Sequence, residues 1–295
     1  VNIMRGRFTR TDTELQPHYA TPLDRAAMPQ DPALQNQIHY LQTQAHYPAC
    51  RNTDVTYYGD TNAALEAQKT DLRKAQHFIF MEYHAIEDSI AWQGIEDILA
   101  ERAAAGVEVR VFYDDMGSIG FVDTAFAKKL QQRGIQCRVF NPIVPVLNVF
   151  MNNRDHRKIT VIDGQVGYTG GYNLADEYFN LTHPYGRWKD TGIRLEGDAV
   201  RSLTLIFLEL WGATQKEPPE IERYLPEVPY TARENAVVLP YADNPLDDEA
   251  TGENVYLNMI RSAKEYVYIT TPYLILSDEM QRTLRLAASS GVDVR

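Results

Sequence analysis

The sequence predicts an α/β protein in which a mixed sheet is flanked by helices and one lobe is repeated with pseudo-two-fold symmetry. Two observations carry this prediction. Apolar stretches with the spacing of strands alternate with longer stretches that have the spacing of helices, which is typical of a sheet with helices packed against it. A segment of about 40 residues also returns later in the chain with its elements in the same order.

The first lobe can be predicted element by element. Residues 77–86 are rich in β-forming side chains and predict a strand, and residues 90–106 carry apolar side chains at helical spacing before a closing glycine. Residues 107–115 predict a second strand that ends in acidic turn residues. Residues 124–134 predict a second helix, again closed by glycine, and residues 135–140 predict a third strand.

The repeat joins two distant parts of the chain. Residues 259–295 repeat residues 71–110, because both run helix, hydrophobic strand, acidic turn, amphipathic helix, glycine and then valine, acid, valine, arginine. The matched pairs are Ala75 with Ala263, Phe78 with Tyr266, Ile79 with Val267 and Gly106 with Gly291. Any two strand–helix units share some of this pattern. The repeat interpretation predicts a two-lobed protein whose second lobe is interrupted at the end of this sequence.

The chain divides into four expected segments. Residues 1–50 are polar and predict an extended lead-in, or a short helix over residues 32–45. Residues 51–213 form the first lobe, and residues 214–235, rich in Pro and Glu, predict a linker. Residues 236–295 are expected to begin the second lobe.

Composition excludes several classes of protein. The 29 Lys and Arg against 40 Asp and Glu give a formal charge of −11, which argues against a general nucleic-acid binder. Cys50 and Cys137 are too few for a disulfide framework, and they predict buried thiols in a reducing compartment. No stretch reaches the roughly 18 consecutive apolar residues of a membrane-spanning helix.

One strand carries a histidine and a lysine with a spacing that suits catalysis. Residues two apart in a strand share a face, so His156 and Lys158 would point the same way, roughly 6.6 Å apart along the chain. A lone histidine on a strand is most often a structural residue. The pair therefore needs support from the residues that follow it.

The residues after this strand predict a hairpin. Asp163 and Gly164 are a strong two-residue turn signal, and the turn would set Gly170 and Gly171 beside the histidine with Asn173 just beyond them. Glycines there would let a ligand approach the backbone closely. Taken alone, each of these residues is explained by a turn or a hairpin. Together they supply a nucleophilic imidazole, an ammonium, an amide donor and open backbone, which suits attack on a phosphodiester.

The whole spacing resembles a known family. H-x-K-x4-D is similar to the signature of the phospholipase D superfamily, and "HRKITVIDG…YTGGYN" resembles its bacterial cardiolipin synthase branch. The stretches "GRWKDTGIRLEGDAV", "ITTPYLILSDEM" and "RLAASSGVDVR" add to the resemblance, which runs in order from about residue 57 to residue 295. It implies an α+β sandwich of the phospholipase D type. Many members have Gly-Ser-x-Asn where this chain has Gly-Gly-Tyr-Asn, so one possible hydroxyl donor is missing.

The resemblance also implies a mechanism. Two phosphatidylglycerol molecules would give cardiolipin and glycerol through a phosphatidyl-histidine, with Lys158 clamping the phosphate and Asp163 acting on the imidazole or on the hairpin. The implied residues are catalytic His156, Lys158 and Asp163, and substrate-binding Asn173, Gly170 and Gly171. No metal or cofactor is required, because cationic side chains carry the charge.

Two-lobed members build one site from two motifs, and their second histidine protonates the leaving glycerol. The roles of the two histidines are interchangeable at this stage. The second motif would fall near position 341, beyond this sequence, so this chain alone is expected to be inactive.

The resemblance implies partners and a location as well. We expect a phospholipid substrate at a bacterial cell membrane, reached through segments absent from this chain, with the catalytic part outside the bilayer. No nucleic-acid partner is expected, and a homodimer could form through the surface that the missing half would cover. The alternatives are a phospholipase D-type phosphodiesterase that hydrolyses phospholipid, a nuclease that completes its site by homodimerisation, and an inactive scaffold.

Other candidates have plainer interpretations. Glu82 and His84 follow the first strand and could approach the site, although an edge or surface role is expected. The acidic pair at 114–115 predicts a turn, and Asp190 is interpreted as support for the core. The apolar segment 141–151 is either a buried strand or a hydrophobic rim that dips into a lipid surface.

Overall fold

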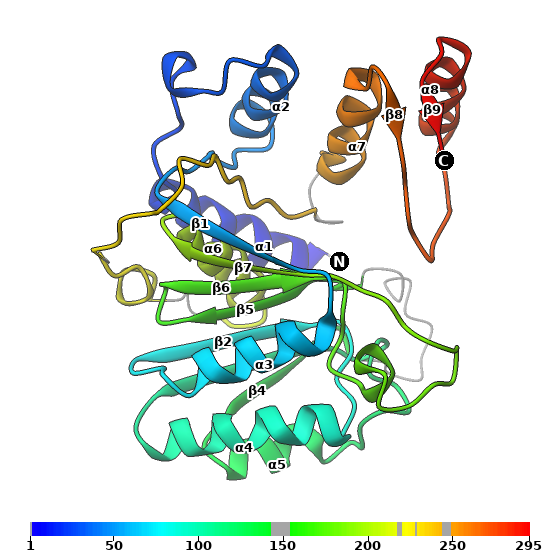
Figure 1. Cartoon of the computed structure of the whole chain (residues 1–295). Helices are drawn as coiled ribbons and strands as arrows, with labels where there is room; N and C mark the ends of the chain where they lie inside the picture. Colours follow the sequence, from blue (N-terminus) through cyan, green and yellow to red (C-terminus); the bar gives the residue numbers. More distant parts are fainter. Residues whose placement is uncertain (1, 143–153, 217–219, 228, 244–248) are drawn as a thin grey trace. The chain divides into compact units, whose positions relative to one another are not determined.

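The computed structural model of the chain is shown in Figure 1. It describes five stretches: residues 2–142, 154–216, 220–227, 229–243 and 249–295. The chain forms two compact units, and each is described by itself. The first unit combines Val1–Thr21 with Ala49–Pro240, and the second combines Pro22–Pro48 with Tyr241–Arg295.

The first unit is built on a seven-stranded mixed sheet with the order β1-β7-β6-β5-β2-β3-β4. Strands β2, β3 and β4 are parallel to one another, and the remaining pairs are antiparallel. The strands are β1 Thr53–Tyr58, β2 Phe78–Tyr83, β3 Glu108–Asp114, β4 Gln136–Phe140, β5 Lys158–Ile162, β6 Val166–Gly170 and β7 Gly192–Gly197. The predicted mixed sheet flanked by helices is therefore confirmed.

Helices cover both faces of this sheet (Figure 1). Helices α3 (Thr61–Leu72), α4 (Ile90–Ala104) and α5 (Phe126–Gln132) share one hydrophobic core with the strands. Helix α6 (Val200–Ala213) packs on the other face, and α1 (Asn2–Leu15) packs against α6. Short 3₁₀ turns lie at Gln16–His18, Arg25–Ala27, Asp176–Phe179 and Glu222–Tyr224.

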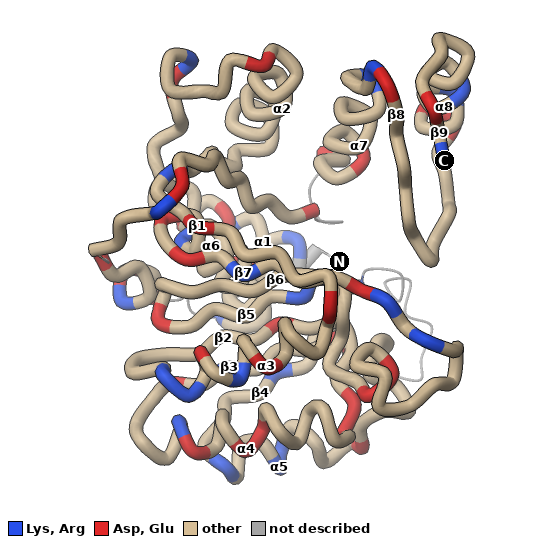
Figure 2. The backbone as a smooth tube through the Cα atoms, in the orientation of Figure 1, with Lys and Arg blue, Asp and Glu red and all other residues tan. Residues whose placement is uncertain are grey.

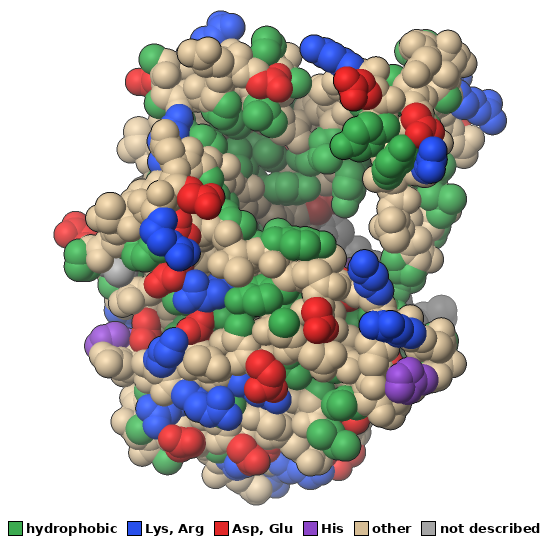
Figure 3. All heavy atoms as spheres, in the orientation of Figure 1, with side chains coloured by type: hydrophobic (Ala, Val, Ile, Leu, Met, Phe, Trp, Pro, Cys, Tyr) green, Lys and Arg blue, Asp and Glu red, His purple; other side chains and the backbone are tan. Residues whose placement is uncertain are grey.

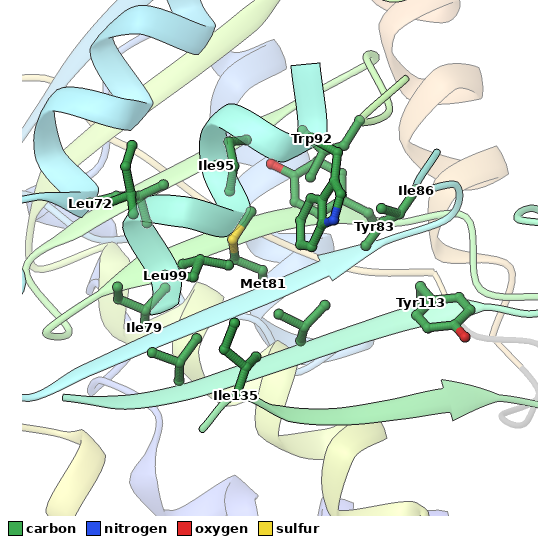
Figure 4. Packing of buried hydrophobic residues seen from close by; sticks show 14 of the residues in the cluster. Leu72, Ile79, Met81, Tyr83, Ile86, Trp92, Ile95, Leu99, Tyr113 and Ile135 are labelled. Atoms are coloured by element: carbon green, nitrogen blue, oxygen red, sulfur yellow. The ribbon is translucent and has the colours of Figure 1, made fainter. Parts of the chain in front are cut away.

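Strand β2 lies at the centre of the core and is buried on both faces. Ile79 and Met81 contact the cluster under α3, α4 and α5, which Figure 4 shows from close by. Phe80 points the opposite way and stacks on Phe207 of α6, with ring centroids 4.5 Å apart. Full burial of such a side chain stabilises the fold by about 1.5–3 kcal/mol. Strand β2 is thus a rigid support for whatever lies at its end.

The predicted elements of the first lobe are confirmed, with small changes at their ends. The helices predicted over 90–106 and 124–134 are α4 and α5, and the strands predicted over 77–86, 107–115 and 135–140 are β2, β3 and β4. The glycines that follow both helices have positive φ, 93° at Gly106 and 81° at Gly134, as helix-terminating residues require. The first and last strands of the lobe, and helices α1 and α6, were not predicted.

The predicted hairpin joins β5 to β6 with one extra residue. Asp163 and Gly164 have φ of 52° and 65°, and the Gln165 amide donates to the Ile162 carbonyl at 3.0 Å, as in a two-residue turn. The ladder nevertheless pairs Ile162 with Val166. Gln165 is therefore an additional residue between the turn and β6, and the pairing is shifted by one residue from that of a two-residue loop.

The second unit contains the repeat. Its elements are α2 Pro32–Thr43, α7 Thr251–Ser262, β8 Tyr266–Val267, α8 Asp278–Ser289 and β9 Asp293–Val294. Tyr266 pairs with Asp293 in a parallel ladder. Phe78, its sequence counterpart, pairs with Glu108 in the same way. The repeat seen in the sequence is therefore also a repeat of strand register.

The domain boundaries drawn from the sequence stay a prediction. The segment 1–50 contains two α-helices, of which α1 belongs to the first unit and α2 to the second. Helix α2 coincides with the helix expected over residues 32–45. The expected linker, where described, belongs to the first unit. Within the described residues, every helix is too short or too polar to cross a membrane.

Candidate active site

His156 and Lys158 lie together where β5 begins. Lys158 is the first residue of the strand and is buried, whereas His156 precedes the strand and is exposed. The Lys158 Nζ donates to the His156 carbonyl at 2.7 Å and lies 3.2 Å from its ring atom Nδ1. The structure thus brings together the two residues that the spacing predicted to share a face.

The surroundings of the pair shift both protonation equilibria toward the neutral form. Loss of solvation, then the Lys158 ammonium and the neighbouring His84, lower the pKa of His156 to about 4. Burial lowers the pKa of Lys158 to about 8, although the carboxylates of Asp155 and Asp190 act in the opposite direction. At neutral pH the imidazole is therefore uncharged, while the lysine is still mostly an ammonium.

A second imidazole lies against the first. His84 follows directly after β2 and is half-buried, and its ring centroid lies 4.5 Å from that of His156, with the rings inclined by 51°. The expected edge or surface role placed it too far from the chemistry. The sequence signal that could have found it is its position directly after a buried strand that pairs with the motif strand.

Asp114, at the end of β3, braces the segment that carries the motif. Its side chain is fully buried and accepts hydrogen bonds from the backbone amides of Asp155 (2.9 Å) and Gly117 (3.0 Å). It also forms an ion pair with Arg154 at 3.2 Å. The acidic pair was expected only to form a turn, but the first of the two residues holds the site segment in place.

A buried cluster of acidic and basic side chains lies behind the motif, on the α6 face. Glu82 is fully buried, so the expected edge or surface position is wrong for it. Its carboxyl group lies 3.7 Å from the Arg157 guanidinium, which also reaches Glu209 of α6 at 3.4 Å. Burial, followed by the charge of Asp155, raises the pKa of Glu82 well above its usual range. Its buried surroundings therefore favour the protonated form of Glu82.

Asn173 is close to the site but its amide is already engaged. Its Oδ1 accepts from the Ala85 amide at 3.1 Å, and its Nδ2 donates to the Tyr178 hydroxyl at 2.7 Å. The residue is buried and ties the segment after β6 to the segment after β2. The Nδ2 group has two protons, and the Tyr178 hydroxyl accepts one of them. A role of Asn173 as a donor to substrate stays a prediction.

The glycine that ends β6 and the one that follows it are required by the packing of the chain itself. A Cβ at Gly170 would lie 2.5 Å from the Thr191 carbonyl, and one at Gly171 would overlap the Asp190 carboxylate. The Gly171 amide donates to the Thr191 carbonyl at 3.1 Å. The close approach that the sequence assigned to a ligand is made here by the segment that precedes β7.

Asp190 belongs to the surroundings of the site as well as to the core. Its carboxylate accepts from the Thr191 amide at 2.8 Å and from the Trp188 indole at 3.3 Å. Its charge favours the ammonium form of Lys158. The sequence placed it in the core because its family-like stretch contains a tryptophan, and nothing in its spacing linked it to the lysine.

Asp163 lies at the opposite end of β5 from His156. Its Oδ1 accepts from the amides of His77 and Phe78, and its Oδ2 accepts from the amide of Gln76, each at 2.8 Å. Asp163 was expected to act either on the imidazole or on the hairpin. Its contacts hold the hairpin against the start of β2. The carboxylate does not reach the imidazole.

The contacts described above do not test two further expectations, which concern the segment 141–151 and the absence of a metal. The apolar segment 141–151 lies outside the described residues, except for its first two. Within the part of the chain that the structure describes, no cluster of three or more His, Cys, Asp or Glu residues could hold a metal ion. Figure 2 shows Lys and Arg interspersed with Asp and Glu along the first unit, so the positive charge at Lys158 is a local feature.

Comparison with known proteins shows what this chain is similar to. Residues 69–191, which include the whole motif, match the family described as "Cardiolipin synthase, PLD-like domain". The crystal structure of phosphatidylserine synthase from Haemophilus influenzae has a similar fold, with a TM-score of 0.59 at 12% identity over 88% of this chain and 65% of that chain. Residues 69–191 are therefore similar to a phospholipase D-like domain.

The sequence is also similar to cardiolipin synthases. Cardiolipin synthase 2 of Staphylococcus epidermidis is 36% identical over 246 residues, which are 82% of this chain and 50% of that protein. An uncharacterized protein of Streptococcus mutans is 46% identical over 249 residues, which are 84% of this chain and 54% of that protein. The chain thus spans about half the length of the curated relatives it matches.

Proposed function

We propose that this chain carries the nucleophilic half of a phosphatidyltransferase site that converts two phosphatidylglycerol molecules into cardiolipin and glycerol. The observation that supports the proposal most is the uncharged His156 imidazole beside the Lys158 ammonium. The similarity to a cardiolipin synthase supports phosphatidyl transfer as the general reaction. The fold shared with a phosphatidylserine synthase is compatible with it.

In the first step a nitrogen lone pair of His156 attacks the phosphorus of phosphatidylglycerol. The N–P bond forms, the P–O bond to the glycerol headgroup breaks, and the leaving oxygen takes a proton from an acid. In the second step a hydroxyl of another phosphatidylglycerol attacks the phosphatidyl-histidine. The N–P bond breaks, and the hydroxyl proton passes to the base that the first step created.

Lys158 has to change partner when the lipid binds. An ammonium can only donate, so its contact with Nδ1 leaves the neutral imidazole with its proton on Nε2 and neither nitrogen free to attack. A phosphate oxygen is a stronger acceptor for the ammonium than an imidazole is. Substrate therefore draws Lys158 toward the equatorial oxygens, and the ring can move its proton to Nδ1 and expose the lone pair of Nε2.

The remaining parts of the reaction come from outside the described contacts. A second histidine, supplied by another lobe or another copy of the chain, would act as the acid for the leaving glycerol. A membrane surface would supply both lipids, with the catalytic part outside the bilayer. Asn173 and Asp190 are placed to support the site through the segments that they tie together.

The experiment is product analysis by mass spectrometry, with the complete gene product and phosphatidylglycerol vesicles. We expect cardiolipin and glycerol in equal amounts, and no cardiolipin from His156→Ala. If phosphatidic acid is the only lipid product, the protein is a phospholipase and not a phosphatidyltransferase. Full cardiolipin synthesis by His156→Ala would overturn the assignment of the nucleophile. His77→Ala, an exposed histidine at the far end of β2, is the matched control.

A further inference from the structure

The backbone beside the catalytic motif is held by an imidazole that the reaction does not use. The antiparallel ladder between β2 and β5 pairs Tyr83 with Lys158, and the His84 amide continues it by donating to the Arg157 carbonyl at 3.1 Å. Beyond this point the ladder is continued by a side chain. The Nδ1 of His84 lies 2.7 Å from the carbonyl oxygen of Asp155, the residue directly before the nucleophile.

This contact defines the tautomer of His84. A carbonyl oxygen can only accept, so Nδ1 carries a proton in the neutral ring as well as in the charged one. The amide of the same Asp155 donates to Asp114. Both backbone groups of Asp155 are therefore fixed by buried or half-buried side chains of two neighbouring strands, which leaves the peptide before His156 little freedom to rotate.

The His84 ring is confined on two sides. One side contacts the ring of His156, with the centroids 4.5 Å apart. Gly117 approaches the edge of the ring so closely that a Cβ there would lie 2.7 Å from Nε2. Gly117 is in turn held by its hydrogen bond to Asp114. The His84 imidazole thus packs between the backbone of Gly117 and the ring of His156.

We propose that His84 is a positioning residue of this site, which holds the Asp155 carbonyl and one side of the His156 ring and so fixes that ring for attack. The proposal rests on the proposed function, in which His156 is the nucleophile. It goes beyond it by giving a role to a residue outside the motif. His84 acts through His156 and does not itself bond to phosphorus.

The same contact affects the charge of His156. The titratable and charged groups that the described structure places around this ring are Lys158 on its own strand, His84 after β2, and the carboxylates of Asp155 and Asp190 close to the lysine. His84 and Lys158 both disfavour a proton on His156, and the packed His84 ring also reduces the solvation of the exposed His156 ring. Removing the His84 ring should therefore make His156 easier to protonate.

Three variants separate the two contacts of His84. His84→Asn keeps a donor near the position of Nδ1 but removes the ring. His84→Phe keeps a ring against His156 but removes the donor. His84→Ala removes both, and His77→Ala is again the control. Circular dichroism and thermal unfolding establish that each variant is folded. If the alanine variant does not fold, the other two still test the proposal.

The first measurement is the titration of His156 by NMR in the 295-residue chain, which does not depend on turnover. In His84→Ala and His84→Asn the pKa of His156 is expected to move upward by about 1, because the ring becomes more fully solvated. In His84→Phe the change is expected to be smaller. An unchanged pKa in folded alanine and asparagine variants would overturn the proposal.

The second measurement is the pH profile of kcat and KM in the complete gene product. His84→Ala is expected to lower kcat about 10- to 100-fold with little change in KM, because a misplaced nucleophile affects the reaction and not lipid binding. Partial recovery in His84→Asn and His84→Phe is expected. Wild-type kcat and pH profile in His84→Ala would overturn the positioning role. Activity in His156→Ala would instead overturn the proposed function, whatever the His84 variants show.

Discussion

The two ends of β5 carry motif residues with opposite kinds of contact. At the His156 end, an exposed imidazole and a buried ammonium lie 3.2 Å apart and both have lowered pKa values. At the Asp163 end, a carboxylate is satisfied by three backbone amides. One end of the strand holds ionisable groups with displaced pKa values, whereas the other saturates its polar group. The same five-residue strand therefore separates a chemical role from a structural one.

The largest expected effect is at the chemical end. Lys158→Met removes the ammonium but keeps a long apolar stem, and we expect kcat/KM to fall about 10²- to 10³-fold, as when one donor to a developing anion is lost. The free energy of unfolding should not fall, because a buried charge is removed together with its desolvation cost. Lys128→Met, on the exposed face of α5, is the control. Wild-type kcat/KM in Lys158→Met would remove the lysine from the chemistry.

The structural end should respond in stability. Asp163→Ala leaves three backbone amides without their acceptor and puts a Cβ-bearing residue without a polar side chain at a φ of 52°. We expect a loss of about 2–4 kcal/mol in the free energy of unfolding, measured by urea denaturation. Asp163→Asn, which tolerates this φ and keeps one oxygen acceptor, should lose less. Equal free energies of unfolding for the wild type, Asp163→Ala and Asp163→Asn would contradict a structural role for this end of the strand.

The pH dependence of the reaction should report the chemical end of β5 and not the Asp163 end. His156 must be uncharged and Lys158 charged, so these two groups limit kcat/KM below a pH of about 4 and above a pH of about 8. Outside this window it should fall about tenfold per pH unit, because one group is then in the wrong form. An activity that rises between pH 8 and pH 10 would contradict the role of the ammonium.

The buried cluster behind the motif should have the smallest effect. The pKa of Glu82 is raised in the folded protein, so its contribution to stability is full below its unfolded pKa and is lost as pH rises through the folded value. Glu82→Gln resembles the protonated form and lacks this loss. We expect it to exceed the wild type by about 1 kcal/mol at high pH and to match it in acid. A wild type that gains stability with rising pH relative to Glu82→Gln would contradict this.

The sequence predicts the strands and the motif well because their information is local. The spacing of two predicts that His156 and Lys158 lie together, although the strand begins only at Lys158, and the Asp-Gly turn returns the chain as β6. The extra residue at Gln165 was not predicted, because a bulge leaves the hydrophobic alternation of the flanking strands intact.

The rest of the site could not be predicted because it depends on which strands are neighbours. His84 and Asp114 come from the ends of β2 and β3, and they meet the motif only because β2 pairs with β5 and β3 lies beside β2. Helix α6 was missed because almost all its residues are buried, so it lacks the polar face by which a helix is recognised.

The repeat also shows that a local pattern predicts strand pairing but not burial. The sequence predicts the common register of β2–β3 and β8–β9, yet the burial of the two copies differs. Strand β2 is fully buried, whereas Tyr266 of β8 is 60% exposed, Val267 is half-buried and residues 268–275 are exposed. Figure 3 shows hydrophobic side chains on this surface of the second unit. Register follows from a local pattern, but burial requires the layers that cover it.

The central claim is that His156 is the nucleophile, and trapping the intermediate tests it most directly. The complete gene product would be mixed with phosphatidylglycerol vesicles, quenched at alkaline pH where a phosphorus–nitrogen bond survives, digested and analysed by mass spectrometry. We predict a phosphatidyl group on the peptide that contains His156, absent in His156→Ala and retained in His77→Ala. Turnover accompanied by an adduct on any other residue would contradict the account.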